Sequence, residues 1–106
     1  MEINQYSVYW TNLDPVIGSE VSKTRPCVII SPDEMNRHLR TAIIAPLTHT
    51  LKLYPSRVLC EINGEKGSVM LDQLRSVDQT RIGAVLSKLD AKEITEIKSV
   101  INQMLC

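Results

Sequence analysis

The stretch Pro26-Cys27-Val28-Ile29-Ile30-Ser31-Pro32-Asp33-Glu34 joins an apolar run to a helix-start signal. Apolar residues between two prolines predict a central β-strand that begins just after the first proline. The serine can cap a helix, the second proline suits the first helical position, and the glutamate completes a capping box. The helix is expected to be short, because residues 41–45 return to a strand pattern. The middle of the chain therefore predicts strand, short helix and strand in succession.

On the N-terminal side, the side chains of residues 6–11 follow a two-residue period that places the apolar Tyr6, Val8 and Trp10 on one face, as in a half-buried strand. Because Trp10 shares the apolar face, we expect it in the core rather than stacked on a ligand. A polar connection from Asp14 to Thr24 follows. It is longer than the usual hairpin loop of about 2–5 residues, and long loops in compact domains often carry function.

On the C-terminal side, three more strands are expected, over residues 56–62, 68–71 and 81–86. Between the first two, Asn63-Gly64 supplies a turn that accepts positive φ. Residues 46–50 (Pro-Leu-Thr-His-Thr) are expected to end the preceding strand in a second polar loop. These elements predict mainly antiparallel neighbours.

The clearest helix follows Asp90, which can cap it while Glu93 closes a capping box and Leu89 packs on Ile94. One apolar stripe runs along it and comprises Ile94, Ile97, Ile101, Met104 and Leu105. Five or six short strands, a short helix and a C-terminal helix predict a small, mainly antiparallel barrel. With no repeat and no linker, residues 1–106 are expected to form one domain.

Composition excludes several classes of protein. No apolar run approaches the ~18 residues of a membrane helix, and the first residues lack a secretory signal. Cys27, Cys60 and Cys106 are widely spaced, which disfavours a disulfide scaffold or a zinc site and indicates a reducing cytoplasm. We expect Cys27 and Cys60 in the core. The chain is thus expected to be cytoplasmic, without a metal or cofactor and without a membrane partner.

Charge is unevenly distributed, although the formal net charge is 0. Residues 21–60 hold six basic and two acidic residues, together with His38 and His49. A basic segment of this kind can contact phosphate, and the alternative is that its charges are simply solvated.

Four clusters follow one another along the chain. They are Val8–Pro15 (VYWTNLDP), Gly18–Glu20 (GSE) with Lys23–Pro26 (KTRP), Pro46–Thr48 (PLT), and Asp72–Asp78 (DQLRSVD) with Arg81. In this order they resemble the MazF/PemK (Kid) family of toxin endoribonucleases from toxin–antitoxin modules. The resemblance covers nearly the whole chain and implies an SH3-like barrel that forms a homodimer.

The resemblance also implies an activity and a partner. Members of this family cut single-stranded RNA such as mRNA at short sequences without a metal ion, leaving a 2′,3′-cyclic phosphate and a 5′-hydroxyl. A cognate, MazE-like antitoxin inhibits them by placing a flexible tail in the RNA groove. A rival function is that of a non-enzymatic toxin similar to CcdB, which inhibits DNA gyrase by binding. That relative depends on a tryptophan in its C-terminal tail, whereas this chain ends Asn-Gln-Met-Leu-Cys.

By this resemblance, the catalytic pair is Arg25 and Thr48. A guanidinium fork matches two phosphate oxygens and stays charged at every relevant pH, which suits a phosphate stabiliser, alone or with proton donation, better than a general base. A threonine hydroxyl can donate to a phosphoryl oxygen. The alternatives are a surface arginine paired with Glu20 and an ordinary turn threonine.

The resemblance places RNA-binding residues around this pair. Glu20, Asp72 and Gln73 fall where the family reads bases or borders the groove, and we add Ser19, Lys23 and His49 to the expected RNA-binding residues. Carboxylates and amides can bond the edges of unstacked bases, and the alternative for Glu20 and Asp72 is a solvated loop position. His49 is not explained by the family. Next to Thr48 it is either an acid or base near neutral pH or an incidental loop residue.

Overall fold

The structure is a computed structural model, which describes residues 2–13, 23–51 and 54–106. Its strands are β1 (Ser7–Asn12), β2 (Thr24–Ile29), β3 (Thr41–Thr48), β4 (Arg57–Ile62), β5 (Glu65–Met70), β6 (Arg75–Asp78) and β7 (Ile82–Lys88). Two helices, α1 (Asp33–His38) and α2 (Ala91–Leu105), and two 3₁₀ turns, η1 (Leu71–Gln73) and η2 (Gln79–Arg81), complete the described part. The predicted barrel with a short helix after the second strand and a C-terminal helix is confirmed.

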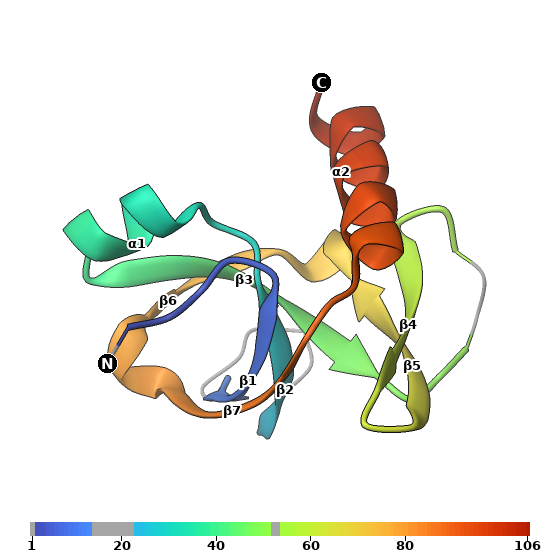
Figure 1. Ribbon diagram of the computed structural model, residues 1–106. Coiled ribbons are helices and arrows are strands. Elements are labelled where there is room, and N and C mark those ends of the chain that lie inside the picture. Colours follow the sequence, from blue (N-terminus) through green and yellow to red (C-terminus); the bar gives the residue numbers. More distant parts are fainter. Residues whose placement is uncertain (1, 14–22, 52–53) are drawn as a thin grey trace.

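The strands form an antiparallel half-barrel in the order β4-β5-β3-β2-β1-β7, with β6 paired to β3. Strand β3 organises it, because its first half pairs with β6 and its last residues, Leu47 and Thr48, pair with β5. The β4–β5 hairpin therefore folds away from the other strands, as Figure 1 shows. Asn63 at the hairpin turn donates from Nδ2 to the carbonyl oxygen of Leu86 in β7, at 3.4 Å, and so links the two ends of the sheet.

Two hydrophobic clusters lie on opposite faces of the central strands. Val8, Val28 and Ala45 belong to the cluster under α2 and the β4–β5 hairpin. Residues one position along each strand, such as Tyr9, Ile29 and Ile44, belong to the other cluster. Because side chains alternate across a strand, β1, β2 and β3 are each packed against a hydrophobic cluster on both faces. This packing fixes the positions of the residues at the ends of these three strands.

Several strand boundaries differ from the sequence expectation, and β5 begins at Glu65 instead of residue 68. β2 begins at Thr24, ahead of Pro26, and its pairing with β3 starts only at Cys27, so the missing N–H of Pro26 interrupts no bond to β3. Residues 46–48 do not form a loop but continue β3, since Leu47 is buried and pairs with Val69. Strand β6 was not expected, because four residues give too short a pattern.

The start of α1 also differs. Pro32 is the N-cap residue, and no side chain caps the helix. The hydroxyl of Ser31 instead donates to the Asn36 side chain at 2.5 Å and accepts from the N–H of Ile43 at 3.0 Å. Ser31 therefore ties α1 to β3, and the predicted capping box is wrong.

The start of α2 is as predicted. Asp90 and Glu93 form both bonds of the capping box, and the second carboxylate oxygen of Glu93 accepts from the N–H of Glu61 in β4. Leu89 and Ile97 are buried, whereas Met104 and Leu105 at the end of the stripe are exposed, because the helix projects beyond the sheet (Figure 1). No helix among the described residues is long and apolar enough to cross a membrane.

Candidate active site

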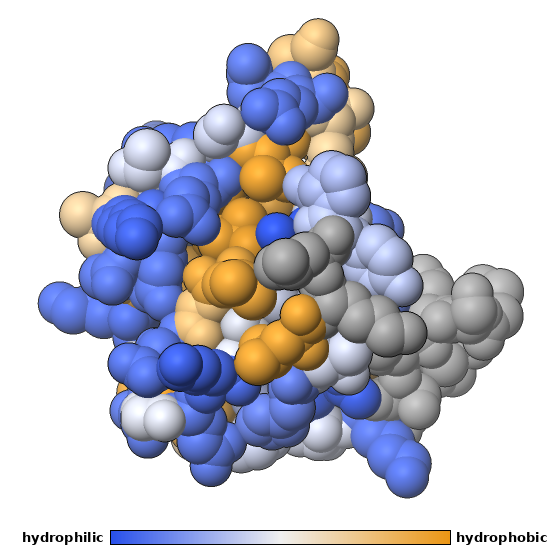
Figure 2. All heavy atoms as spheres, turned by 90° about the vertical axis from the view of Figure 1, so that its right-hand side faces the viewer, coloured by the Kyte–Doolittle hydropathy of each residue, from blue (hydrophilic) through white to orange (hydrophobic). Residues whose placement is uncertain are grey.

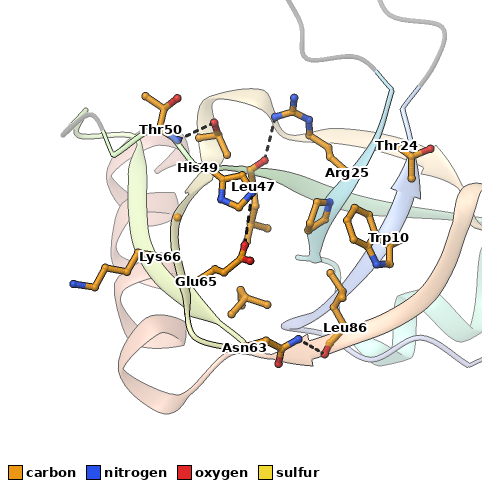
Figure 3. Close-up of a pocket in the computed structure, with 14 residues that line it drawn as sticks. Trp10, Thr24, Arg25, Leu47, His49, Thr50, Asn63, Glu65, Lys66 and Leu86 are labelled. Atoms are coloured by element: carbon orange, nitrogen blue, oxygen red, sulfur yellow. Dashed lines mark hydrogen bonds and ion pairs between the residues drawn. The ribbon is translucent and has the colours of Figure 1, made fainter.

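A cavity of about 510 Å³ opens at the end of the sheet where the β4–β5 hairpin turns away from β1 and β2 (Figure 3). Its walls are mostly apolar and include Pro26, Leu47, Ile62 and Leu86. Polar side chains from three different strands and the chain after β3 line the same space. Its volume and apolar character fit a site for a small group of a ligand, with a few polar side chains to orient it.

Arg25 reaches this cavity from β2, where it pairs with Thr11 of β1. Its Nη1 donates to the carbonyl oxygen of Leu47 at 3.2 Å, which holds the guanidinium beside the end of β3. Its Nε is buried and has no hydrogen-bond partner among the described residues. The bond to Leu47 uses one corner of the guanidinium fork, so the planar group is oriented and still has donors for an anion.

Thr48 is the last residue of β3 and pairs with Ser68 of β5. Its Oγ1 accepts from the N–H of Thr50 at 3.2 Å. A hydroxyl has one hydrogen and two acceptor positions, so accepting this bond leaves the hydrogen of Thr48 available to an oxygen in the cavity. Ser68, which is fully buried, donates to the carbonyl oxygen of Thr50 at 3.0 Å and so anchors the turn.

Gly67 allows strand β5 to approach the end of β3 closely. A Cβ atom at Gly67 would lie 2.8 Å from the carbonyl oxygen of Thr48, a distance that Cβ atoms essentially never adopt. The absence of a side chain is therefore what lets β5 lie against the Thr48 backbone.

His49 and Glu65 face each other at the mouth of the cavity. Their Nε2 and Oε2 atoms are 3.9 Å apart, and the two side chains are 81% and 74% exposed. An ion pair this open contributes little free energy, so both side chains can turn toward a ligand.

Trp10 corrects one sequence expectation. It is 42% exposed and lines the cavity, so its assignment to the core is wrong. Its strand neighbours Tyr9 and Thr11 are buried, and Val8, two residues earlier on the same face, lies in the core. Trp10 lies beyond the point where that core ends, which alternation alone does not reveal.

The structure does not bring the other predicted site residues into this cavity. Lys23 is exposed just before β2. Asp72 on η1 accepts from Ser56 at 3.2 Å and lies 3.5 Å from Nε of Arg57, and Gln73 next to it donates to the sulfur of Met70. Ser19, Glu20 and most of the 14–24 connection lie outside the described residues. Within the described part, no three metal-ligating side chains gather.

Comparison with known proteins identifies the family. Residues 4–105 match the family model of the PemK-like, MazF-like toxin of type II toxin–antitoxin systems. The chain belongs to this toxin family. The predicted family is therefore confirmed.

Individual members of the PemK/MazF family support the family assignment, by sequence and by fold. The endoribonuclease MazF of Staphylococcus saprophyticus is 32% identical over 101 residues, which cover 90% of this chain and 84% of that protein. The crystal structure of MazF from Deinococcus radiodurans has a TM-score of 0.88 at 26% identity and covers 99% of this chain and 97% of that one. A MazE–MazF complex from the same organism has a TM-score of 0.82 at 25% identity, with 99% and 97% covered.

Sequence reasoning missed the hairpin side of the site. Asn63 and Glu65 line the cavity, and both lie in the β4–β5 hairpin. The Asn-Gly turn predicted that hairpin correctly, with φ of 51° and 85° at its two residues. The pairing of β5 with the end of β3, which brings the hairpin to Arg25, is a long-range contact that no local pattern indicates.

Proposed function

We propose that this toxin is a metal-independent endoribonuclease that cuts single-stranded RNA, including mRNA, at a short sequence. Its products are a 2′,3′-cyclic phosphate and a 5′-hydroxyl. The observation that carries the proposal is that the guanidinium of Arg25 and the hydroxyl of Thr48 line one cavity in a member of this family. The endoribonuclease names of its relatives support the same activity.

The reaction is an internal transfer of the phosphoryl group. The 2′-oxygen of a ribose forms a bond to its own 3′-phosphorus, and the bond from that phosphorus to the 5′-oxygen of the next nucleotide breaks. A proton leaves the 2′-hydroxyl and another arrives at the 5′-oxygen, so the charge balance is unchanged. Positioning and stabilisation of the extra charge on the phosphoryl oxygens supply most of the rate enhancement in such transfers.

Arg25 and Thr48 divide this work. Arg25, oriented by Leu47, binds the phosphoryl oxygens and stabilises the charge that develops on them. Thr48 donates its hydroxyl hydrogen to one of the same oxygens, since its acceptor side is occupied by Thr50. Both groups sit at strand ends rather than on free loops, so the site needs little reorganisation in the reaction.

RNA extends beyond the cavity in this proposal. Lys23, two residues before Arg25, binds a neighbouring phosphate. The remaining contacts are assigned to Ser19, Glu20, His49, Asp72 and Gln73. Carboxylates and amides among them read the edges of unstacked bases, which is how single-stranded RNA is usually recognised.

The proposal includes a homodimer and a cognate antitoxin. Figure 2 shows a band of hydrophobic surface on the side of the molecule that carries β4 and α2. Exposed apolar residues on these two elements include Leu59, Met104 and Leu105. A second copy that covers this surface would bury it, as small domains often require. An antitoxin of the MazE type then places an acidic, flexible tail against Arg25 and excludes RNA.

One assay tests the activity. The purified chain is incubated in EDTA with a mixed pool of single-stranded RNA, and the cut sites and end groups are mapped. We expect cuts at one short sequence with cyclic-phosphate and 5′-hydroxyl ends. Absence of cleavage together with inhibition of DNA gyrase would instead establish the CcdB-like function.

A further inference from the structure

The cavity has an apolar part that the transfer of the phosphoryl group does not use. Trp10 and Glu65, the latter from β5, line it from opposite sides (Figure 3), and Pro26 and Leu47 also line the cavity. Trp10 is 42% exposed although the strand on both sides of it is buried. A large aromatic ring left open to solvent in a concave apolar site is suited to stack on a flat group.

We propose that this part of the cavity binds one nucleobase of the RNA, stacked on Trp10, and that Glu65 makes guanine the preferred base. The proposal rests on the endoribonuclease function above, because Arg25 holds the adjoining phosphate in the same cavity. Glu65 is then a specificity-determining residue, and Trp10 provides affinity for any base.

The preference for guanine follows from the hydrogen-bonding groups of the bases. An ionised carboxylate only accepts hydrogen bonds. The Watson–Crick edge of guanine offers two adjacent donors, N1–H and the N2 amino group, which match the two oxygens of Glu65. Adenine and cytosine place an acceptor nitrogen beside their amino donor, and uracil places its donor between two carbonyl oxygens. Each of those bases would bring a lone pair toward the carboxylate.

Glu65 is free to make these bonds. Its contact with His49 is 3.9 Å long, and its side chain is 74% exposed. Asn63, two residues earlier, is already engaged with Leu86 through its Nδ2, so Glu65 is the group of the hairpin best placed to read a base. Stacking on Trp10 needs no particular base, because every base presents a flat π-face.

The chain contains one tryptophan, so its fluorescence reports directly on this site. The probes are 2′-O-methyl hexauridine, which cannot be cleaved because its 2′-oxygen is blocked, and the same oligonucleotide with one guanosine, adenosine or cytidine. Binding is followed by Trp10 quenching and by anisotropy of a labelled end. We expect quenching by all four, and about tenfold tighter binding of the guanine probe, within the range of a bidentate contact to a base.

Variants separate the two roles. Glu65→Gln should reduce the guanine advantage to about twofold or less, since an amide offers one acceptor and one donor. Trp10→Ala should weaken all four probes by about tenfold, and Trp10→Phe should restore most of that loss. Glu96→Gln, the same exchange on the exposed face of α2, is the control and should leave the preference as it is.

The outcomes are distinct from those of the cleavage assay. No quenching, or equal binding of the four bases by the unmodified chain, overturns the proposal even if RNA is cut. Guanine-selective quenching that Glu65→Gln abolishes supports it even if the assumed cleavage chemistry fails. If only an antitoxin peptide quenches Trp10, the cavity binds a protein side chain and the nucleobase assignment is wrong.

Discussion

Nη1 of Arg25 donates to the carbonyl oxygen of Leu47 at 3.2 Å, and Leu47 immediately precedes Thr48. The two side chains proposed for catalysis are therefore held together through one backbone group. On the other side of β3, Gly67 lies so close that a Cβ atom would approach the Thr48 carbonyl to 2.8 Å. The position of Thr48 thus depends on β2 and on β5 at once.

Gly67→Ala is expected to displace Thr48 and to slow RNA cleavage by about tenfold or more. The added methyl group meets backbone, which cannot rotate away, and a shift of ~1 Å in a catalytic group can cost up to about 10²-fold. Single-turnover cleavage, with circular dichroism to verify folding, measures this. Gly64→Asn is the control, since asparagine tolerates the positive φ and no atom lies within 4 Å of the new Cβ. Equal rates for the two variants would disprove the positioning role of Gly67.

His49→Gln is expected to keep most of the activity. The side chain is 81% exposed, and its one ion pair within the described residues is the 3.9 Å contact with Glu65, so its loss should change the rate by less than about fivefold. The pH–rate profile between about pH 5.5 and 8 should also keep its shape, because an imidazole in proton transfer would titrate there. A step in that profile that disappears with His49 would show that it acts as an acid or base.

The capping box of α2 allows a test of stability apart from catalysis. Asp90→Ala removes the cap and should lower the free energy of unfolding by about 1 kcal/mol. Glu93→Ala should lower the free energy of unfolding further, because Glu93 also accepts a hydrogen bond from the N–H of Glu61 in β4 at 2.9 Å. Thermal unfolding compares the two, and neither residue lines the cavity, so cleavage at low temperature should be unchanged. A melting temperature that falls no further for Glu93→Ala than for Asp90→Ala would contradict this.

Thiol reactivity follows burial. Burial raises the pKa of Cys27 and of Cys60 to about 12, while Cys106 is exposed. Because the thiolate is the reactive form, an aromatic disulfide reagent near pH 8 should titrate only Cys106 in the native chain and all three thiols after denaturation. In the unfolded chain these thiols ionise near pH 9, so the stability of the fold should decrease as the pH rises from about 9 toward 12. Rapid reaction of Cys27 or Cys60 in the native chain would show that their strands open.

Much of the fold could be predicted from the sequence because its signals are local. The capping box at Asp90 and the positive φ at Asn63-Gly64 each depend on a few adjacent residues. The helix cap predicted at Ser31 is wrong because the Ser31 hydroxyl makes a distant contact instead of a local one. It accepts a hydrogen bond from the N–H of Ile43, twelve residues away. A tertiary contact replaced the local one there.

The candidate site was predictable only in part. Arg25 and Thr48 were assigned by family resemblance, and their approach to one cavity depends on the pairing of β2 with β3. Trp10 was misplaced, because alternation gives the face of a strand but not where the core beneath it ends. Glu65 was missed, because it is brought to the cavity by the pairing of β3 with β5.

The central claim, that Arg25 and Thr48 carry the reaction, is tested most directly by single-turnover cleavage of one short RNA by Arg25→Ala and by Thr48→Ala. Matched controls are Arg37→Ala, an exposed arginine bonded to Glu34, and Thr95→Ala, whose hydroxyl bonds within α2. We predict that each catalytic variant loses about 10²-fold or more in rate, as when one charge-stabilising donor is removed, while the controls cut at the wild-type rate. A folded Arg25→Ala or Thr48→Ala variant that cleaves as fast as its control would contradict the mechanism.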